Sequence, residues 1–344
     1  MARAERSVLH VLPHAGGGGD TYVDVLEAMP GYLSTRVHLA PARKPGPAGV
    51  GRGLLELARQ IRGHDLLHVH GEGAASLLLP LVGLHRSVVT LHGLHLLRRA
   101  TGPRRSVAAL NLRAVVHAAD RTICVSTAEQ SILAAAAGRA LTERKTAVVH
   151  NGTRLPAETT AAERANVRAE LGLSDSALVG IWVGSLDERR DPVAVVRAAE
   201  ASGTTLLIVG EGHLRDEVER VAGTHVRVLG QRNDVPRLLS AADVFVLMSQ
   251  REGLSFALVE AMAHGLPSVV ADIPENLEAV ADSGILVPYG DAEAVSDALR
   301  RMTEDAAARS RMGEHARRRA RDTFSAERMI EKTRAVYDDV LGAL

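Results

Sequence analysis

Short runs of aliphatic residues alternate with alanine-rich stretches along the whole of this 344-residue chain. Each run is short and bounded by turn residues, a rhythm that is typical of parallel strands covered by helices. The sequence therefore predicts an α/β fold. The expected strands are Val8–Leu12, Arg36–Leu39, Leu66–His70, Ser87–His92, Arg121–Val125, Thr146–His150, Ala177–Val183, Thr205–Val209, Val226–Leu229, Val244–Met248, Pro267–Ala271 and Gly284–Val287.

A polar, alanine-rich segment from Leu155 to about Asp175 separates the first six expected strands from the second six. It contains one predicted helix, Arg164–Leu171, which ends at a glycine. This break predicts two similar doubly wound units, residues 1–155 and 156–325, rather than one sheet. Ligands of such sheets bind outside the carboxyl ends of the strands, so two units facing each other would bind two substrates.

The last predicted helix, from about Ala326 to Leu344, has an apolar stripe opposite its charged residues. We expect this stripe to be buried against one of the two domains, and the first domain is the candidate. The stripe consists of Met329, Thr333, Val336 and Val340.

The charges balance overall, with 41 basic and 41 acidic side chains, which argues against a general nucleic-acid binder. Their distribution is uneven, because there are 19 basic and 10 acidic side chains through Leu155 but 22 and 31 beyond it. We therefore expect the two regions to bind different partners.

The cysteine content and the length of the apolar runs exclude several classes of protein. The single cysteine, Cys124, excludes a disulfide framework and a cysteine-rich metal site, and a buried strand thiol is expected there. No apolar run is long enough to span a bilayer, and the stretch Val8–Leu12 is too short for a signal peptide. We expect a cytoplasmic setting.

The most informative segment runs from Ser249 to Pro267 and follows an expected strand. It turns at Gly253 and continues as a helix in which apolar residues flank Glu260 on every side. A carboxylate buried there is costly unless it accepts hydrogen bonds, and two ribose hydroxyls would supply them. The alternative is that Glu260 lies on a solvated stripe or bonds to nearby backbone.

Glu252 lies in the loop before this helix. The backbone amides that follow it, from Gly253 through Leu254 and Ser255 to Phe256, favour an anion such as a diphosphate. The alternative for Glu252 is an ordinary solvated glutamate at a loop tip.

Two glutamates separated by seven residues and followed by Ala-Met-Ala-x-Gly-x-Pro resemble the Glu-x7-Glu motif of retaining glycosyltransferases of family four. Segments across both halves of the chain resemble that family in the same order. They are Gly17–Asp20, Val89–Gly93, Val125–Ser126, Asn151–Gly152, Gly230–Pro236, Leu238–Leu247, Pro274–Glu275 and Gly284–Asp291.

The resemblance implies a GT-B fold, in which two doubly wound, Rossmann-like domains face a central cleft. Residues 1–155 would bind the acceptor and residues 156–325 the nucleotide sugar, and the helix over 326–344 would cross back onto the first domain.

The resemblance also implies roles for residues of the motif. Glu260 would bind the ribose hydroxyls, Glu252 would contact the transferring sugar, and the amides of residues 254–256 would face the diphosphate. His92 matches the family's histidine beside the reacting face of the donor sugar. A structural histidine is the alternative, because the chain has 15 histidines and several lie near His92.

A glycine run near the amino terminus allows close backbone approach to a ligand. The resemblance implies that Gly17 and Gly18 approach the donor phosphates or the acceptor, and a flexible turn is the alternative. No Gly-Lys-Ser/Thr follows, which excludes a P-loop.

The chain departs from the family at the loop after the seventh expected strand. Ser185 stands where the family has an arginine, and Arg190 stands where it has a lysine. Serine brings no charge, whereas Arg190 could still clamp a phosphate with two hydrogen bonds. Either Arg189 or a first-domain cation compensates, or the enzyme is slow. The alternative for both arginines is a solvated pair matched by neighbouring acids.

The resemblance implies transfer of a sugar with retention from a nucleoside diphosphate donor, UDP first and GDP second, to a hydroxyl of a lipid, saccharide or specialised metabolite. No metal is required, and the sequence has neither Asp-x-Asp nor a His/Cys cluster with ligand spacing. Three alternatives stay open: a sugar-nucleotide epimerase, a phosphorylase, and a nucleotide-sugar-binding partner subunit with little activity.

The basic first domain favours an anionic acceptor or contact with an acidic membrane surface. The arginines that suggest this patch are Arg98, Arg99, Arg104 and Arg105. A solvated basic loop is the alternative.

Overall fold

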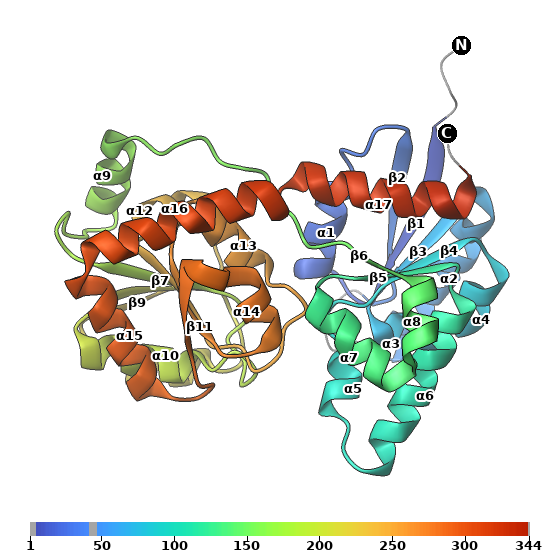
Figure 1. The fold of residues 1–344 in the computed structure, drawn as a ribbon, viewed down its shortest axis with the longest axis horizontal. Coiled ribbons are helices and arrows are strands. Elements are labelled where there is room, and N and C mark those ends of the chain that lie inside the picture. The colour runs from blue at the N-terminus through green and yellow to red at the C-terminus, as the bar shows by residue number, and fades with distance from the viewer. Residues whose placement is uncertain (1–4, 41–46, 343–344) are drawn as a thin grey trace. The chain divides into compact units, whose positions relative to one another are not determined.

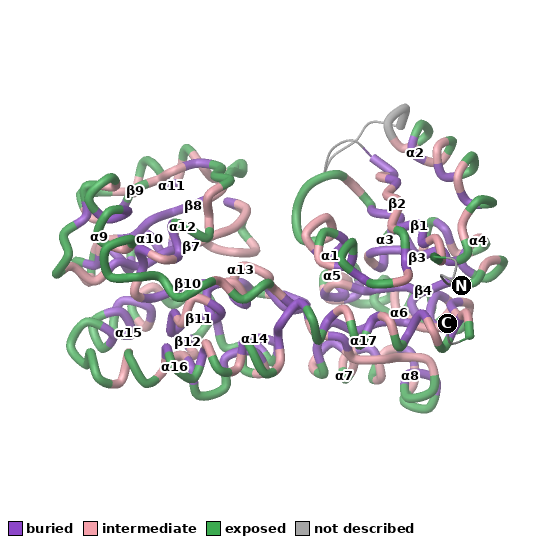
Figure 2. The backbone as a smooth tube through the Cα atoms, turned by 90° about the horizontal axis from the view of Figure 1, so that it is seen from above, coloured by how far each residue is buried: buried purple, intermediate pink, exposed green. Residues whose placement is uncertain are grey.

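The computed structural model describes residues 5–40 and 47–342. Its contacts divide the chain into unit 1, Met1–Gly152 with Ala326–Leu344, and unit 2, Thr153–Ser325. Each unit is a parallel sheet covered by helices on both faces (Figure 1). The strands of both sheets are largely buried, while the helices expose their outer sides (Figure 2). The predicted α/β architecture with two doubly wound units is confirmed.

Unit 1 has a six-stranded sheet in the order β2-β1-β3-β4-β5-β6. Its strands are β1 Arg6–Leu12, β2 Tyr32–His38, β3 Leu66–His70, β4 Ser87–Thr90, β5 Arg121–Cys124 and β6 Thr146–Val148. Its helices are α1 Gly18–Leu26, α2 Pro47–Gln60, the 3-10 turn η1 Ile61–Gly63, α3 Glu72–Leu77, α4 Leu79–Leu84, α5 His95–Arg99, α6 Pro103–Ala118, α7 Thr127–Ala137, α8 Arg139–Lys145 and α17 Ala326–Leu341.

Unit 2 has a second six-stranded sheet in the order β12-β11-β10-β7-β8-β9. Its strands are β7 Val179–Val183, β8 Thr205–Val209, β9 Val226–Gly230, β10 Val244–Leu247, β11 Ser268–Ala271 and β12 Gly284–Val287. Its helices are α9 Ala161–Glu170, α10 Pro192–Ser202, α11 Arg215–Val221, α12 Val235–Ala241, α13 Phe256–Ala263, α14 Pro274–Val280, the 3-10 turn η2 Ala281–Ser283, α15 Ala292–Glu304 and α16 Ala306–Thr323.

Each sheet has one point at which its strand order reverses. In unit 2 this point lies between β7 and β10, and in unit 1 it lies between β1 and β3. The loops that leave two such strands diverge to opposite faces, and ligands of doubly wound sheets bind in the crevice that this opens at the carboxyl ends. The loops after β7 and β10 therefore border the position where this type of sheet binds ligands in unit 2.

The last helix, α17, packs on unit 1. Its predicted stripe is buried, and two of its polar side chains reach the sheet. The hydroxyl of Tyr337 lies 2.6 Å from Nδ1 of His68, and the hydroxyl of Tyr32 donates to Oδ1 of Asp338 at 2.7 Å. The buried stripe residues are Met329, Thr333, Val336 and Val340.

The two segments where the chain passes between the units lie side by side. Thr153 forms a parallel bridge with Ser325, and its amide donates to the carbonyl of Phe324 at 2.9 Å. The amide of Gly152 lies 3.1 Å from the sulfur of Met329. One backbone hydrogen bond and one contact from backbone to sulfur therefore hold the two crossing segments together.

Strand boundaries differ from the sequence expectations in two informative places. The strand β2 begins at Tyr32, four residues earlier than expected, because it pairs with β1 from the Arg6–Tyr32 pair onward. The missed part has little hydrophobic signal, since Leu33 is exposed and Ser34 and Thr35 are polar and half-buried. The strand expected over Ser87–His92 ends at Thr90, because the backbone turns into positive φ at His92. Among the described helices, none is long and apolar enough for a membrane span.

Candidate functional site

The loops after β7 and β10 meet at the reversal point of the unit 2 sheet. The amide of Gln250 donates to the carbonyl of Arg189 at 2.8 Å, and Nη1 of Arg189 reaches the carbonyl of Arg251 at 3.4 Å. Residues about sixty positions apart in the sequence are thereby fixed to each other, because β7 and β10 are neighbours.

Glu252 is buried in this loop pair, with 6% of its surface exposed. Its Oε1 lies 3.4 Å from Nε of Arg190, and its Oε2 lies 3.9 Å from Nη1 of Arg189. Arg189 also lies 3.8 Å from Asp187. The alternative of a solvated glutamate is therefore wrong. The two arginine side chains are 11% and 18% exposed, so they are not solvated, although Asp187 does pair with Arg189 as their alternative expected.

Glycines make this packing possible. A Cβ on Gly184 would lie 2.3 Å from Nη1 of Arg190, and a Cβ on Gly210 would lie 1.8 Å from the carbonyl oxygen of Gly184. The guanidinium of Arg190 thus rests directly on backbone. The next residue, Ser185, is half-buried and brings no charge at the position where the family resemblance implies an arginine.

The helix α13 begins directly after this loop. Ser255 caps it, because its Oγ accepts a hydrogen bond from the amide of Leu258 at 3.4 Å. Among the described residues, no acceptor is found for the backbone amides of Phe256 and Ala257. Free amides at a helix amino terminus favour an anion. Gly253 and Leu254 are buried and Phe256 is half-buried.

Glu260 lies one turn further along α13 and is half-buried. Its carboxylate accepts no hydrogen bond from the described residues. Burial raises the pKa of Glu260 from 4.5 to about 7, with no compensating donor. The carboxylate therefore keeps hydrogen-bonding capacity that donors of a ligand could use.

In unit 1, His92 lies two residues beyond β4 in a turn of positive φ. The φ angles are 59° at His92, 113° at Gly93 and 50° at Leu94. Non-glycine residues rarely adopt such angles, and they persist where surrounding structure enforces them. Buried Glu129 does so here, because it accepts hydrogen bonds from the amides of Gly93 and Val125.

Sequence reasoning missed Glu129. The available signal was the pattern Ser-Thr-Ala-Glu at residues 126–129, which resembles a capping box. The amide of Glu129 does bond to Oγ of Ser126 at 3.0 Å, but its carboxylate turns to the neighbouring loop instead of closing the box.

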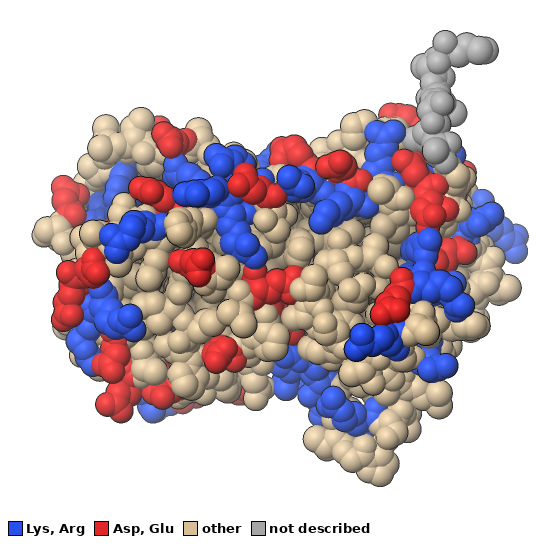
Figure 3. Space-filling view, in the orientation of Figure 1, with Lys and Arg blue, Asp and Glu red and all other residues tan. Residues whose placement is uncertain are grey.

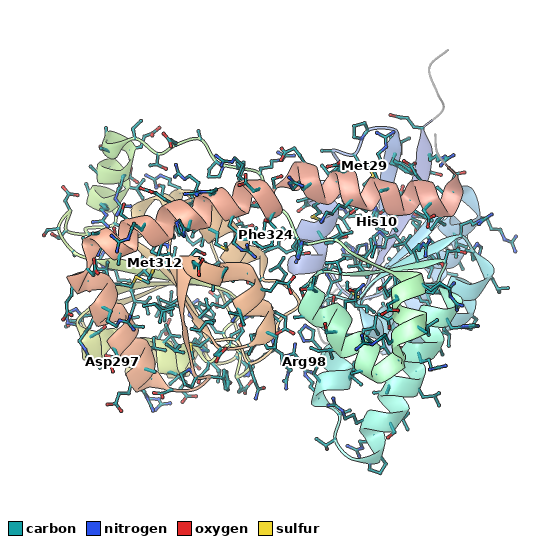
Figure 4. All side chains as sticks on the ribbon, viewed as in Figure 1. His10, Met29, Arg98, Asp297, Met312 and Phe324 are labelled. Atoms are coloured by element: carbon teal, nitrogen blue, oxygen red, sulfur yellow. The ribbon has the colours of Figure 1, made fainter. Side chains whose placement is uncertain are left out.

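A row of histidines lies behind His92. Its Nε2 is 3.1 Å from Nδ1 of His70, whose Nε2 is 3.0 Å from Nδ1 of His10. His10 lies in the sheet of unit 1 below α17 (Figure 4). Burial lowers the pKa of His10 and of His92 to about 3, and lowers that of His70 well below its usual value, so these rings are neutral.

Sequence spacing gave no metal-ligand cluster, yet His10, His68 and His70 come together in the fold. Each offers a ring nitrogen, and these nitrogens lie within 4.8 Å of one another. The grouping was not visible in the sequence because it depends on the pairing of β1 with β3, which sets His10 beside His68. Their nitrogens are already engaged in hydrogen bonds.

The glycine run near the amino terminus forms the turn before α1. Gly16 and Gly17 have φ angles of 81° and 100°, and a Cβ on either would meet open space. Oδ2 of Asp20 accepts from the amide of Gly16 at 2.6 Å, and Oδ1 lies 2.8 Å from Nε2 of His38. The turn is hydrogen-bonded, and it leaves Gly17 and Gly18 open at the start of the helix.

Exposed basic and apolar side chains share the α5–α6 hairpin. Arg99, Arg104 and Arg105 are exposed, and Val107 and Leu110 are each 68% exposed. Blue side chains gather in this part of the surface (Figure 3), and Arg98 lies on α5 itself (Figure 4).

The two halves of the chain match models of one enzyme family. Residues 9–155 match the model described as Glycosyltransferase Family 4, and residues 180–305 match Glycosyl transferases group 1. The two doubly wound domains define a GT-B fold. The chain belongs to the family-four glycosyltransferases.

Among curated proteins, the chain is 29% identical over 213 residues to an Escherichia coli UDP-Gal:alpha-D-GlcNAc-diphosphoundecaprenol alpha-1,3-galactosyltransferase, covering 57% of this chain and 55% of that one. It is 29% identical over 187 residues to the N-acetyl-alpha-D-glucosaminyl L-malate synthase of Bacillus anthracis, covering 51% and 49%. The chain thus spans about half the length of these relatives.

Solved structures share the fold over nearly the whole chain. Anabaena HepE in complex with UDP-glucose superposes with a TM-score of 0.81 at 19% identity, covering 97% of this chain and 100% of that one. The sucrose-phosphate synthase of Thermosynechococcus elongatus superposes with a TM-score of 0.79 at 21% identity, covering 98% and 99%.

Proposed function

We propose that this chain is a retaining glycosyltransferase that moves a sugar from a nucleoside diphosphate donor, UDP first and GDP second, to a hydroxyl acceptor. One observation carries the proposal. The reversal point of the unit 2 sheet holds the buried Glu252–arginine cluster, and the helix that follows presents the unbonded carboxylate of Glu260.

The protein would bind the ribose and the diphosphate of the donor with different groups. Glu260 would accept hydrogen bonds from the two ribose hydroxyls, which removes the penalty of its burial. The amides of Phe256 and Ala257, with Arg189 and Arg190, would face the diphosphate. Fixed dipoles and cations there stabilise the charge that develops on the leaving group, and removing one such donor typically costs about 2.7–4 kcal/mol of barrier.

The reaction would then need little acid–base chemistry from the protein. Glu252 would contact the transferring sugar and His92 its reacting face. We expect the departing phosphate to take the proton of the acceptor hydroxyl, and we expect no metal requirement. Transfer that survives chelation by EDTA would support this part of the proposal.

We further propose an anionic or lipid-linked acceptor, with peripheral contact between unit 1 and an acidic membrane surface. Arg104 and Arg105 lie in the first turn of α6, where cations oppose the helix dipole. Helix stability therefore does not explain them, whereas an external anion does. Val107 and Leu110 would add apolar contact. The relative from Escherichia coli is named for a lipid-linked diphosphate acceptor.

The test is thermal unfolding of the full chain with UDP, GDP and ADP, followed by donor screening with the preferred nucleotide. A ligand at 100 times its Kd adds about 2.7 kcal/mol to folding, which is an easily measured shift. We expect UDP to stabilise most and a UDP-sugar to yield a product of retained anomeric configuration. No stabilisation by any nucleotide would overturn the proposal.

Ser185 favours one alternative, a nucleotide-sugar-binding subunit with little activity. Tight nucleotide binding without transfer or donor hydrolysis, across a broad panel of donors and acceptors, would select it. Isomerisation of the sugar nucleotide without an acceptor would indicate an epimerase. A reaction that depends on inorganic phosphate would indicate a phosphorylase.

A further inference from the structure

A hydrogen-bonded row of side chains crosses four neighbouring strands of unit 1. It runs from Ser34 on β2 to His10 on β1, then to His70 on β3 and to His92 just after β4, which is the order of the strands in the sheet. The contacts are 3.3 Å from Oγ of Ser34 to Nε2 of His10, then 3.0 Å and 3.1 Å between the rings. His10 and His70 are buried, while Ser34 and His92 are half-buried at the two ends.

Proton counting restricts this row to two states. Each neutral ring carries one proton, and each nitrogen-to-nitrogen contact needs one. If His92 carries its proton on Nδ1, then His70 and His10 must also carry theirs on Nδ1, and Ser34 donates to His10. If His92 carries its proton on Nε2, the other two rings do likewise, and His10 donates to Ser34. Mixed tautomers would break a contact.

We propose that the row is a tautomer relay in which His70 and His10 set whether Nδ1 of His92 donates or accepts a hydrogen bond. His70 and His10 are then positioning residues that act through His92. The reaction relevance rests on the proposed function, in which His92 faces the donor sugar, but the coupling of the three rings does not.

The surroundings of the row keep its rings neutral. The ring of Tyr22 from α1 covers it edge-on, at 5.0 Å from His92 and 5.4 Å from His70. His68 stacks on His70 at 4.1 Å. From α17, Tyr337 faces His68, and from β2 the charge of Arg36 acts on His10 and His70. A protonated ring would therefore be a buried charge, and on His10 and His70 it would also be repelled by Arg36.

His68 provides a matched control. It is as buried as His10, but its nitrogens bond to Thr90 at 2.7 Å and to Tyr337 at 2.6 Å, outside the row. Loss of His68 should therefore disturb packing without uncoupling His92.

The test is ring-¹⁵N spectroscopy of histidine-labelled full chain without ligand, with resonances assigned from single variants. We expect His10, His70 and His92 to show one common tautomer. Two different tautomers among them, or a charged ring at neutral pH, would overturn the relay. A bound metal ion would also overturn it, because a metal on His10 and His70 needs the lone pair that holds their mutual bond. Metal analysis and zinc addition check this.

Variants supply the second readout. His70→Phe should leave His92 as a mixture of tautomers and lower kcat about tenfold or more with little change in donor KM, because a wrongly protonated imidazole is badly aligned. His68→Phe should preserve the His92 tautomer. Equal effects of the two variants on the His92 spectrum would overturn the proposal.

If His70→Phe does not fold, Ser34→Ala at the half-buried end of the row is the second variant. It should shift the tautomers of all three rings together, and a change confined to His10 would overturn the relay. If no transfer is detectable, the spectra still decide the relay.

Discussion

Nε of Arg190 lies 3.4 Å from Oε1 of Glu252, and the two side chains are 18% and 7% exposed. The carboxylate stands between two guanidinium groups, since Arg189 approaches its other oxygen at 3.9 Å. Glu252 therefore offsets part of the positive charge of the two arginines that we propose to bind diphosphate. Because Glu252 is buried, breaking this pair should cost more free energy of unfolding than breaking an ion pair on the surface.

Glu252→Gln should separate the two roles of this side chain. Transfer should fall about 100-fold, as for loss of a transition-state contact. UDP affinity should stay equal or increase, because Arg189 and Arg190 both lose the charge of Glu252 while only Arg189 keeps its contact with Asp187. The free energy of unfolding should fall by about 1–3 kcal/mol. Turnover, UDP titration and denaturant unfolding measure these effects.

The control for this variant is Glu219→Gln on α11, which removes an exposed partner of Arg215 and should change stability by less than about 0.5 kcal/mol. Near-normal turnover in Glu252→Gln would contradict the role assigned to Glu252.

Glu260→Gln should stabilise the free protein while weakening donor binding. The pKa of Glu260 is about 7 in the folded chain and 4.5 as the ordinary value, so its ionisation costs stability as the pH rises through that window. The variant should gain at most about 3 kcal/mol above neutral pH and nothing below pH 4.5. Thermal unfolding across pH, with and without UDP, measures both effects.

In the unmodified protein, UDP binding should strengthen as the pH rises through about 7, because only the ionised carboxylate of Glu260 accepts both ribose hydroxyls. A pH-independent UDP affinity, or an equal UDP response in the glutamine variant, would remove Glu260 from the ribose site.

Gly184→Ala should displace Arg190 without disturbing the fold. The new Cβ would fall 2.3 Å from Nη1 of Arg190, the far end of a flexible side chain that can move. We expect UDP affinity to fall about tenfold, the value of one charged hydrogen bond. Gly63→Ala, whose Cβ meets nothing within 4 Å, is the control. Unchanged affinity, measured by calorimetry, would mean that Arg190 does not bind phosphate.

Ser185→Arg should restore the missing cation and tighten UDP binding, by about tenfold if one charged hydrogen bond forms. Calorimetric titration of UDP measures the change. Weaker binding would place Ser185 away from the diphosphate.

Arg104→Ser combined with Arg105→Ser should weaken binding to vesicles that contain phosphatidylglycerol. Each arginine near an anionic surface contributes about 1 kcal/mol, so the double variant should lose one to two orders of magnitude in affinity. Arg59→Ser with Arg220→Ser removes two exposed arginines elsewhere and should have little effect. Sedimentation with phosphatidylcholine vesicles gives the background, and equal binding to both lipids would contradict the proposed surface.

The strands show how much local pattern can reveal. The spacing of aliphatic runs predicted all of the strands described, with errors of a few residues at their ends. The largest error, at Tyr32, arose because β2 is held by pairing with β1 rather than by its own hydrophobicity. Glu260 was also recognisable as a candidate, since its apolar neighbours on one helix indicated a carboxylate that needs hydrogen-bond donors, although a solvated position or a bond to nearby backbone stayed open.

The partners of these residues were not recognisable. The contact between Glu252 and Arg190 joins loops that only the pairing of β7 with β10 brings together. The row from Ser34 to His92 needs four strands in their spatial order. Sequence by itself determined the periodicity, the caps and the family motif, because these depend on neighbours along the chain. The tertiary structure decided burial, charge pairing and proton position, because these depend on groups that distant parts of the chain supply.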